Sequence, residues 1–210
     1  MIHVFIADDH EIVREGIKRV LTKLPDIKVV GEAADGRSLL SQIWNSTADV
    51  LILDITMHGP GFLETLGHLA KRRPSLKVLV LSVHPEEQFA VRALKTGAAG
   101  YLMKDRTSNE LVEAIRRVHR GGRFVSADLA ERLVAELQPS GEKLPHERLT
   151  DREYEIFLRI GSGESVKDIA AELSLSPKTV STYRARIIEK SGLKTNAEMI
   201  RYVIENHLAA

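Results

Sequence analysis

The first 120 residues alternate five times between a short apolar run and a longer amphipathic segment, and this alternation restricts the fold more than any other feature. Each run is rich in Val, Ile and Leu and is followed by a helical pattern, as in strands buried on both faces of a parallel sheet. We expect strands near residues 2–7, 27–31, 49–54, 77–82 and 99–103, and helices near 11–23, 36–46, 62–72, 86–96 and 108–120.

The last of these helices shows why the segments between the runs are assigned as helices. Leu111, Ile115 and Val118 recur at three- and four-residue spacing, and Thr107 with Glu110 forms a capping box at the start. Such a helix lies with one face on a sheet. Five β-α units with right-handed crossovers predict an α/β domain with a doubly wound, flavodoxin-like, five-stranded parallel sheet.

Four of the five apolar runs close on a side chain with useful chemistry. FIADD closes on Asp8 and Asp9, VLILD on Asp54, VLVLS on Ser82, and GYLMK on Lys104. Because parallel strands present their carboxyl ends along one edge of a sheet, these side chains are expected to meet there. Several carboxylates, one hydroxyl and one ammonium favour a phosphoryl-transfer site.

Crowded carboxylates explain why such a site calls for a cation. Three of them repel one another, and one is expected to have a raised pKa unless a proton or a cation intervenes. The hard, octahedral Mg²⁺ ion resolves this repulsion and leaves positions open for phosphoryl oxygens. A phosphoryl group passed to one of these carboxylates would give an acyl phosphate, with Lys104 stabilising the transferred oxygens.

Each of these residues also has a purely structural interpretation. Asp8 and Asp9 could serve as an N-cap pair for the helix at 11–23, and Lys104 could be a solvated residue after a strand. Ser82 could merely cap the helix that follows it. Their joint placement at separate strand ends favours the chemical interpretation.

Composition limits the classes of protein that this chain can belong to. Its 210 residues, 43% hydrophobic, are enough for two modest domains. There is no cysteine, so disulfides and thiolate metal sites are excluded. No apolar run approaches the roughly 18 residues of a membrane helix, and the N-terminus runs directly into strand-like sequence. We expect a soluble cytoplasmic protein with no membrane partner.

The last third of the chain has a different pattern. After a helix at 126–137 comes QPSGEKLPHER at 138–148, a polar segment with Pro and Gly that suits a linker. Beyond it nothing has the pattern of a buried strand, which favours a small all-α domain. Four short helices are expected at 151–161, 166–173, 177–190 and 196–206.

Two of these helices have helix-turn-helix spacing. KDIAAEL, then SLS, then PKTVSTYRARIIEK places a helix on either side of a tight turn, and the second helix of this motif enters the major groove of DNA. Residues 146–210 hold ten Lys or Arg and ten Asp or Glu, whereas 178–194 hold five Lys or Arg against Glu189 alone. A basic face on a neutral domain suits phosphate contact.

Helical phase divides the second helix of this motif into two faces. Val180, Ile187 and Ile188 fall on the core side; on the other side, small polar residues can approach base edges while long cations reach phosphates. An ordinary solvated charged face is the alternative. The predicted DNA-contacting residues are Lys178, Thr179, Ser181, Thr182, Tyr183, Arg184, Ala185, Arg186 and Lys190.

Two ordered parts of the sequence carry a resemblance to a known family. The strand-end residues of the first half, followed by LTDREYEIF, the DIAAELSLSPKTVSTYRARI block and the closing LKTNAEM, resemble the NarL/FixJ-type response regulators. The resemblance implies a phosphoacceptor receiver domain at 1–122, a helix and linker at 123–147, and a LuxR-type helix-turn-helix DNA-binding domain at 148–210.

The resemblance also implies a role for each strand-end residue. Asp54 would be the phosphoacceptor, and Mg²⁺ would be held by Asp8, Asp9, Asp54 and the backbone carbonyl of Thr56. The three switch residues would be Ser82, whose hydroxyl follows the phosphoryl group, Lys104, its charge partner, and Tyr101, an aromatic that changes rotamer on activation. Taken alone, Tyr101 is more typical of core or edge packing than of a switch.

The sequence departs from the family at a few positions. ITMHGPGFLE has His58 where the family usually has Pro and Phe62 where it usually has Gly, so the shape of the loop at 55–62 is in doubt. Asp105 after Lys104 excludes a cis-prolyl bond there. His84 is a candidate for tuning the lifetime of the aspartyl phosphate, although a surface histidine is the simpler interpretation, and Trp44 is expected in the core.

The function implied is a transcriptional regulator that is not an enzyme in its own right. A sensor histidine kinase would phosphorylate Asp54, releasing the domain at 146–210 to dimerise and bind two half-sites of promoter DNA related by a two-fold axis. The candidate dimer contact on the last helix is Met199, Ile200, Val203 and Ile204, with closure of the domain's own core as the alternative.

Two other functions remain open at this point. One is a DNA-binding regulator that is never phosphorylated and uses its receiver only for dimerisation; the altered loop at 58–62 favours it and the acidic set disfavours it. The other is a Mg²⁺-dependent phosphohydrolase resembling the haloacid dehalogenases. It lacks a segment for a substrate pocket and gives the helix-turn-helix no role.

Overall fold

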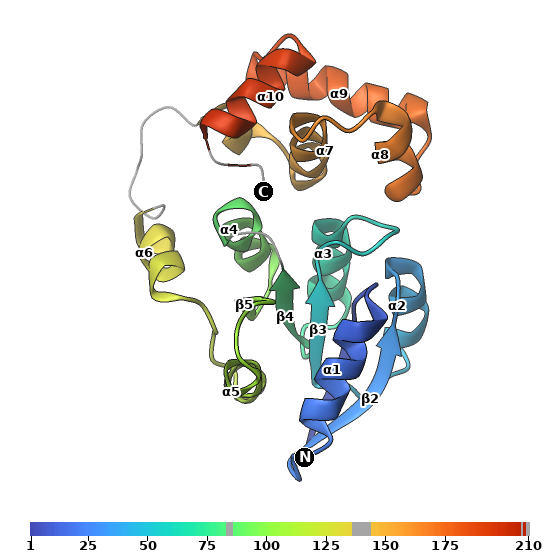
Figure 1. The fold of residues 1–210 in the computed structure, drawn as a ribbon, viewed down its shortest axis with the longest axis vertical. Helices are drawn as coiled ribbons and strands as arrows, with labels where there is room; N and C mark the ends of the chain where they lie inside the picture. The colour runs from blue at the N-terminus through green and yellow to red at the C-terminus, as the bar shows by residue number, and fades with distance from the viewer. Residues whose placement is uncertain (83–85, 136–143, 207, 209–210) are drawn as a thin grey trace. The chain divides into compact units, whose positions relative to one another are not determined.

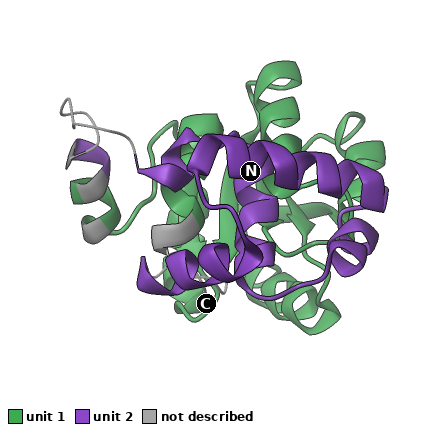
Figure 2. Ribbon diagram, turned by 90° about the horizontal axis from the view of Figure 1, so that it is seen from above, with its two compact units in different colours: residues 1–131 green, residues 132–210 purple. Residues whose placement is uncertain are grey.

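The computed structural model describes residues 1–82, 86–135, 144–206 and 208, and within these ranges it leaves the side chains of 86–88, 128, 132 and 135 undescribed. The chain forms two compact units, residues 1–131 and 132–210 (Figure 2). His84 and most of the predicted linker at 138–148 lie outside the described residues. Each unit is described by itself below.

The first unit is built on a parallel sheet of five strands (Figure 1). Its order, β2-β1-β3-β4-β5, is the flavodoxin-like order, so the predicted fold class is confirmed. The strand register sets Ala7 beside Leu53 and Asp54 beside Leu81, which brings the carboxyl ends of neighbouring strands level. The strands are β1 (Ile2–Ala7), β2 (Ile27–Ala33), β3 (Val50–Asp54), β4 (Lys77–Ser82) and β5 (Gly100–Met103).

Five helices follow these strands in alternation. They are α1 (Glu11–Leu21), α2 (Gly36–Ile43), α3 (Phe62–Arg72), α4 (Glu86–Thr96) and α5 (Ser108–His119). The predicted bounds of α3 and α4 are confirmed, whereas α2 ends three residues before the predicted end. The chain turns away there because the Arg73 guanidinium donates hydrogen bonds to the backbone carbonyls of Ile43, Ser46 and Ala48. The last two bonds are 2.8 Å long.

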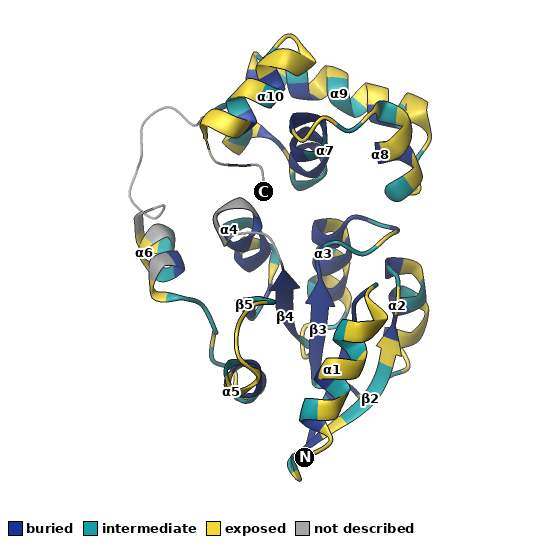
Figure 3. Ribbon diagram, viewed as in Figure 1, coloured by how far each residue is buried: buried dark blue, intermediate teal, exposed yellow. Residues whose placement is uncertain are grey.

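The core lies on both faces of the sheet; β3 is buried along its whole length (Figure 3), and β1 and β4 are buried at all but one residue each. On one face Val4, Ile6 and Ile52 pack with the apolar sides of α1 and α5. The alternate residues of the same strands, such as Phe5 and Leu53, point to the other face, where α3 contacts α2 and α4. A sheet covered on both faces explains why the strands were recognisable as continuous apolar runs.

The prediction that Trp44 lies in the core is wrong. Its side chain is 36% exposed, and the Arg72 guanidinium carbon lies 5.6 Å from the ring centroid. Because α2 ends at Ile43, Trp44 falls at the helix end and beyond the buried stripe of that helix. A cation–π contact with Arg72 takes the place of burial.

The end of the first unit is tied back to the sheet. The Thr107–Glu110 capping box of α5 is confirmed, with the Thr107 amide donating to Glu110 Oε2 at 3.0 Å. After α5 the chain returns to β5, where the Tyr101 amide donates to the Phe124 carbonyl at 2.9 Å. Gly100 is required beside this contact, since a Cβ there would lie 2.7 Å from that carbonyl oxygen.

The second unit is all helical, as predicted, in the part that the structure describes. Thr150, Ser165, Ser176 and Thr195 each accept a backbone hydrogen bond at a helix start, which explains why the starts could be read from the sequence. The division between units falls within α6 (Ala127–Ala135). The remaining helices are η1 (Pro145–Arg148), α7 (Asp151–Gly161), α8 (Val166–Glu172), α9 (Pro177–Ser191) and α10 (Asn196–Glu205).

The crossing of α7 and α10 leads to a stability prediction. A Cβ added at Gly161 would collide with the Val203 side chain, so we expect Gly161→Ala to destabilise the second unit by about 1–3 kcal/mol. Gly16→Ala is the matched control, because nothing lies within 4 Å of a Cβ there, and it should stabilise α1 by about 0.5–1 kcal/mol. Native-state hydrogen exchange reports each helix separately; unchanged protection of α7 and α10 in Gly161→Ala would contradict the close crossing.

Candidate functional site

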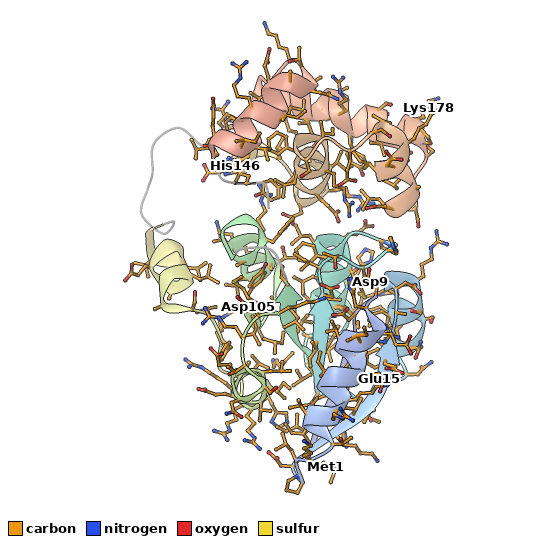
Figure 4. All side chains as sticks on the ribbon, in the orientation of Figure 1. Met1, Asp9, Glu15, Asp105, His146 and Lys178 are labelled. Atoms are coloured by element: carbon orange, nitrogen blue, oxygen red, sulfur yellow. The ribbon has the colours of Figure 1, made fainter. Side chains whose placement is uncertain are left out.

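The strand-end residues of β1, β3 and β5 meet at one edge of the sheet. Lys104 Nζ lies 2.7 Å from Asp8 Oδ2 and 3.0 Å from Asp54 Oδ2. Asp8 and Asp54 are fully buried, and the Lys104 side chain is 10% exposed. Asp9, labelled in Figure 4, lies at the end of the sheet to which the arrows of β3 and β4 point. The predicted convergence of these side chains is therefore present.

Asp54 has one oxygen that is engaged and one that is not. Its Oδ2 accepts a hydrogen bond from the Thr56 hydroxyl at 2.6 Å and faces Lys104. Its Oδ1 is buried and accepts no hydrogen bond from any residue that the structure describes. A buried carboxylate oxygen without a donor is costly unless a cation or an incoming group uses it.

The turn after β1 gathers the other acidic groups. Asp8 Oδ1 accepts a hydrogen bond from the His10 amide at 2.9 Å, which fixes the turn that leads into α1. One ligand atom each from Asp8, Asp9, His10 and Asp54 lies within 4.8 Å of all the others. The donor set of three carboxylates at one point fits a hard divalent cation such as Mg²⁺. His10 was missed by the sequence reasoning, although its position directly after the acidic pair was a signal.

The N-cap alternative for the acidic pair receives partial support. His10 is the N-cap residue of α1 and makes no side-chain cap bond. Asp8 contributes to the helix start through the His10 amide, yet its second oxygen faces Lys104. Asp8 thus supports both the turn and the charged cluster.

Lys104 carries the positive charge of the cluster. Burial lowers the pKa of its ammonium, but hydrogen bonding and Coulombic attraction from Asp8 and Asp54 outweigh burial and raise the pKa above the ordinary 10.5. The side chain therefore stays protonated in the neutral range. It offsets the charge of two buried carboxylates in a space from which water is largely excluded.

Ser82 and Tyr101 lie on the two strands next to this cluster. Ser82 is fully buried at the end of β4, and its carbonyl accepts a hydrogen bond from the Lys104 amide at 2.7 Å. Tyr101 is 1% exposed and pairs with Val80 in the sheet. Leu102 belongs to the core shared with α1 and α5, so Tyr101 points to the opposite face, where α4 contacts β5.

The loop after Asp54 has a defined shape despite its unusual sequence. The His58 carbonyl accepts a hydrogen bond from the Gly36 amide at the start of α2, at 2.9 Å. Gly59 has φ +118°, a backbone conformation that residues other than glycine rarely adopt. Phe62 is buried and packs edge-on against Phe89 of α4, with 5.4 Å between ring centroids. The departures at His58 and Phe62 are therefore part of the packing of this loop.

The second unit contains the predicted helix-turn-helix. Helices α8 and α9 are joined at residues 173–176, where Ser174 adopts φ +55°. The Ser176 hydroxyl then accepts a hydrogen bond from the Thr179 amide at 3.0 Å. Ser176 is thereby the N-cap of α9, and Pro177 lies in the first turn. In helix-turn-helix proteins the second helix of such a pair enters the major groove of DNA, and α9 is the second helix here.

The two faces of α9 separate as the helical phase predicted. Val180 and Ile187 are buried, and Ile188 is half-buried. Figure 4 labels Lys178, whose side chain extends from the unit into solvent. The remaining predicted DNA-contacting residues are exposed at Ser181, Thr182, Ala185 and Arg186, and half-buried at Thr179, Tyr183, Arg184 and Lys190.

Two of the predicted phosphate contacts have partners inside the unit. Lys190 Nζ lies 2.8 and 2.7 Å from the two carboxylate oxygens of Glu153 on α7, whose side chain is 3% exposed. Arg184 Nε donates to the Asn196 side chain at 2.7 Å. Lys190 thus joins α9 to α7, a role that the sequence did not indicate because its partner lies 37 residues away.

Helix α10 carries the four residues of the candidate dimer contact. Met199 and Val203 are fully buried, and Val203 packs on Gly161 of α7. They close the core of their own unit, which was the alternative left open by the sequence. Ile200 is half-buried and Ile204 is 61% exposed, so these two are the members of the set that are accessible on the surface.

Comparison with known proteins decides the family. Residues 4–116 match the response regulator receiver domain, and residues 147–203 match the luxR family of bacterial regulatory proteins. The response regulator UvrY of Escherichia coli K12 is 37% identical over 209 residues, covering 99% of this chain and 96% of UvrY. The chain belongs to the NarL/FixJ family of two-component response regulators. GacA of Pseudomonas aeruginosa, another response regulator, is 39% identical over 200 residues, covering 95% of this regulator and 94% of GacA.

Solved structures share both parts of the regulator's fold. RcsB of Salmonella typhimurium matches with a TM-score of 0.74 and 25% identity, over 100% of this regulator and 98% of RcsB. RcsB of Salmonella enterica serovar Typhimurium bound to the promoter P1flhDC with the phosphomimetic BeF3⁻ matches with a TM-score of 0.71 and 26% identity, over 97% and 98% of the two chains. Unit 1 is thus a receiver and unit 2 contains a LuxR-type DNA-binding domain.

Two further findings concern the acidic pocket and the membrane. Receiver domains as a class hold Mg²⁺ in an acidic pocket, and Asp8, Asp9 and Asp54 form such a pocket here. In the part of the chain that the structure describes, none of the helices combines the length and the apolar character needed to cross a membrane.

The Glu153–Lys190 pair predicts how the DNA-binding unit responds to pH. Burial raises the pKa of Glu153, but Lys190 and the Thr150 cap outweigh it and lower the pKa below the ordinary 4.5. A carboxylate with a lowered folded pKa stabilises the fold above its unfolded pKa, and this contribution is lost as the pH falls below 4.5 through the folded pKa. We expect Glu153→Gln to destabilise the unit by roughly 1.5–3 kcal/mol at pH 7 and by progressively less below pH 4.5.

The measurement is urea unfolding followed by amide NMR signals of the second unit, at pH 7 and at acidic pH. Lys190→Met removes the same pair from the other side and serves as the matched variant, so its difference from the wild type should also shrink in acid. A Glu153→Gln difference that is constant across this pH range would show that the ion pair is not the stabilising interaction.

Proposed function

We propose that Asp54 accepts a phosphoryl group from a sensor histidine kinase and that this event controls the binding of the regulator to promoter DNA. The observation that carries the proposal is the buried cluster in which Lys104 spans Asp8 and Asp54 while Asp54 Oδ1 has no donor among the described residues. In the transfer an Asp54 oxygen bonds to phosphorus as the bond from phosphorus to the kinase histidine breaks.

Mg²⁺ is the cofactor that we propose for this step. Asp8, Asp9, Asp54 and the backbone carbonyl of Thr56 would hold it, and when bound it would supply positive charge for the transferred oxygens. Lys104 would provide the second positive charge, from a side chain already fixed by two buried carboxylates. The regulator's chemistry in this proposal is confined to its own phosphorylation and dephosphorylation, so it is a transcriptional regulator and not an enzyme acting on other substrates.

The signal would be read on the strands beside Asp54. Phosphorylation adds charge and acceptor oxygens at the end of β3, and the Ser82 hydroxyl lies at the same edge on β4. Tyr101, buried on the α4 side of β5, would change rotamer when that edge rearranges. Ser82, Lys104 and Tyr101 are therefore proposed as the residues that convert phosphorylation into a conformational change.

The output would be binding of α9 to DNA. The exposed stripe of Lys178, Ser181, Thr182, Ala185 and Arg186 supports this, with small side chains for base edges flanked by cations for phosphates. RcsB has been solved on promoter DNA, and the same use is proposed here for two half-sites bound by a homodimer. Of the candidate dimer contacts, Ile200 and Ile204 have the surface for it. Kinase and promoter are both met in the cytoplasm, where we propose that the regulator works.

A second function is favoured by one observation. The loop at 58–61 is held to α2 through the His58 carbonyl and the Gly36 amide, in a sequence unlike that of most receivers. If this loop closes the phosphorylation site, the protein would act as a phosphorylation-independent regulator whose receiver serves for dimerisation. A Mg²⁺-dependent phosphohydrolase has no comparable support.

Acetyl phosphate with Mg²⁺, followed by intact-mass measurement, tests the phosphorylation site. We expect one phosphoryl adduct on the wild type and on the control Asp105→Asn, whose exposed carboxylate lies next to Lys104. Asp54→Asn should give none, because its amide cannot act as the nucleophile. An adduct that survives Asp54→Asn would remove the assignment, and no adduct on the wild type would favour the phosphorylation-independent function.

The DNA-binding face is tested by the salt dependence of promoter binding. Lys178→Ala should weaken binding to all sequences alike and flatten the slope of log affinity against log salt by about one unit, as expected for a lost phosphate contact. Arg201→Ala, an exposed cation on α10, should leave the slope unchanged. A change in sequence preference alone would assign Lys178 to base contact instead.

A further inference from the structure

His10 places an imidazole nitrogen directly beside the acidic pocket. Its Nδ1 lies 2.8 Å from Asp9 Oδ1 and 3.4 Å from Asp8 Oδ1. Asp9 Oδ1 is buried and has no hydrogen-bond partner in the described part of the chain, so the short contact with His10 lacks hydrogen-bond geometry. The two atoms thus approach each other closely without a hydrogen bond between them.

The separations of these atoms match the coordination shell of one ion. Bonds from a first-row divalent ion or Mg²⁺ to oxygen or imidazole nitrogen are about 2.1 Å long, so ligands at right angles lie about 3 Å apart and opposite ligands about 4.2 Å apart. The contact of 2.8 Å between His10 and Asp9 is close to the first value. The ligand atoms of Asp8, Asp9, His10 and Asp54 all lie within 4.8 Å of one another, which is slightly more than the separation of opposite ligands.

A second observation points independently to a bound cation. Asp54 is fully buried and supplies one carboxylate oxygen to this pocket, and its Oδ1 has no donor among the described residues. Lys104 lies beside Asp8 Oδ2 and Asp54 Oδ2. Lys104 offsets the charge of Asp8 and Asp54, so a cation bound beside Asp9 and His10 would complete the charge balance of the three carboxylates.

We propose that His10 Nδ1 is a ligand of the pocket's metal ion, so that this receiver binds first-row transition cations more tightly than Mg²⁺. The proposal rests on the metal site of the proposed function and names the ligand that sets its selectivity. Imidazole suits transition cations, whereas carboxylate and carbonyl oxygens suit Mg²⁺, and affinity for mixed nitrogen and oxygen sites rises from Mn²⁺ through Co²⁺ to Ni²⁺. The His10 side chain is 64% exposed, which leaves the ring free to complete the shell.

Isothermal titration of the full-length, tag-free protein with CoCl₂ and with MgCl₂, in the absence of any phosphodonor, tests this ligand. We expect His10→Ala to lower Co²⁺ affinity at least 10-fold and to change Mg²⁺ affinity by less than about twofold. The control is His68→Ala, an exposed histidine on α3, which should change neither affinity. The visible absorption of bound Co²⁺ should also change in His10→Ala, because one nitrogen ligand is replaced by water.

Each other outcome overturns the proposal. Equal losses for both ions in His10→Ala would mean that His10 only orients Asp9, and unchanged Co²⁺ affinity would mean that it does not touch the ion. Failure of the proposed metal site itself is distinguishable, because Asp9→Ala would then leave both affinities at their wild-type values.

Discussion

The carboxyl-terminal edge of the sheet depends on one interaction, the contact of the Lys104 ammonium with Asp8 and Asp54. The two carboxylates come from β1 and β3 and are fully buried, so an unpaired charge there would be strongly unfavourable. Lys104 reaches them from the end of β5, two strands away from β3 in the sheet. The contacts of Lys104 therefore depend on the strand order, because the order β2-β1-β3-β4-β5 brings these three strand ends together.

The same constraint explains how much could be predicted from the sequence. Asp8, Asp54, Ser82 and Lys104 follow apolar runs that are buried on both faces, and parallel strands leave their carboxyl ends at one edge. Local signals therefore sufficed for the strands, for the caps at Thr107 and Ser176, and for the convergence of the site. The chemical role of each residue depended in addition on the family resemblance.

The features that the sequence could not predict depend on contacts distant in the chain. Trp44 is a large apolar residue of the kind usually found in cores. However, Arg73 donates hydrogen bonds to carbonyls just after α2, and the helix ends before Trp44. Lys190 lies in the basic segment predicted to contact phosphates, but its ammonium is hydrogen-bonded to Glu153 on α7. Helical phase placed Met199 and Val203 on an apolar face without saying whether a partner or their own unit covers that face, and the structure assigns them to their own core.

Packing between α3 and α4 bears on how a signal at Asp54 would reach the α4 face. Phe62, eight residues after Asp54, packs against Phe89 near the start of α4. At the other end of the two helices, a Cβ at Gly97 would lie 2.8 Å from the Ala70 side chain.

An aromatic pair such as Phe62 and Phe89 contributes about 0.5–1.5 kcal/mol beyond the area that it buries. Shifting a conformational equilibrium from 1:99 to 99:1 needs about 5.5 kcal/mol of differential stabilisation. The Phe62–Phe89 contact alone therefore falls short of a full switch. Other contacts that change on activation would have to supply most of the difference.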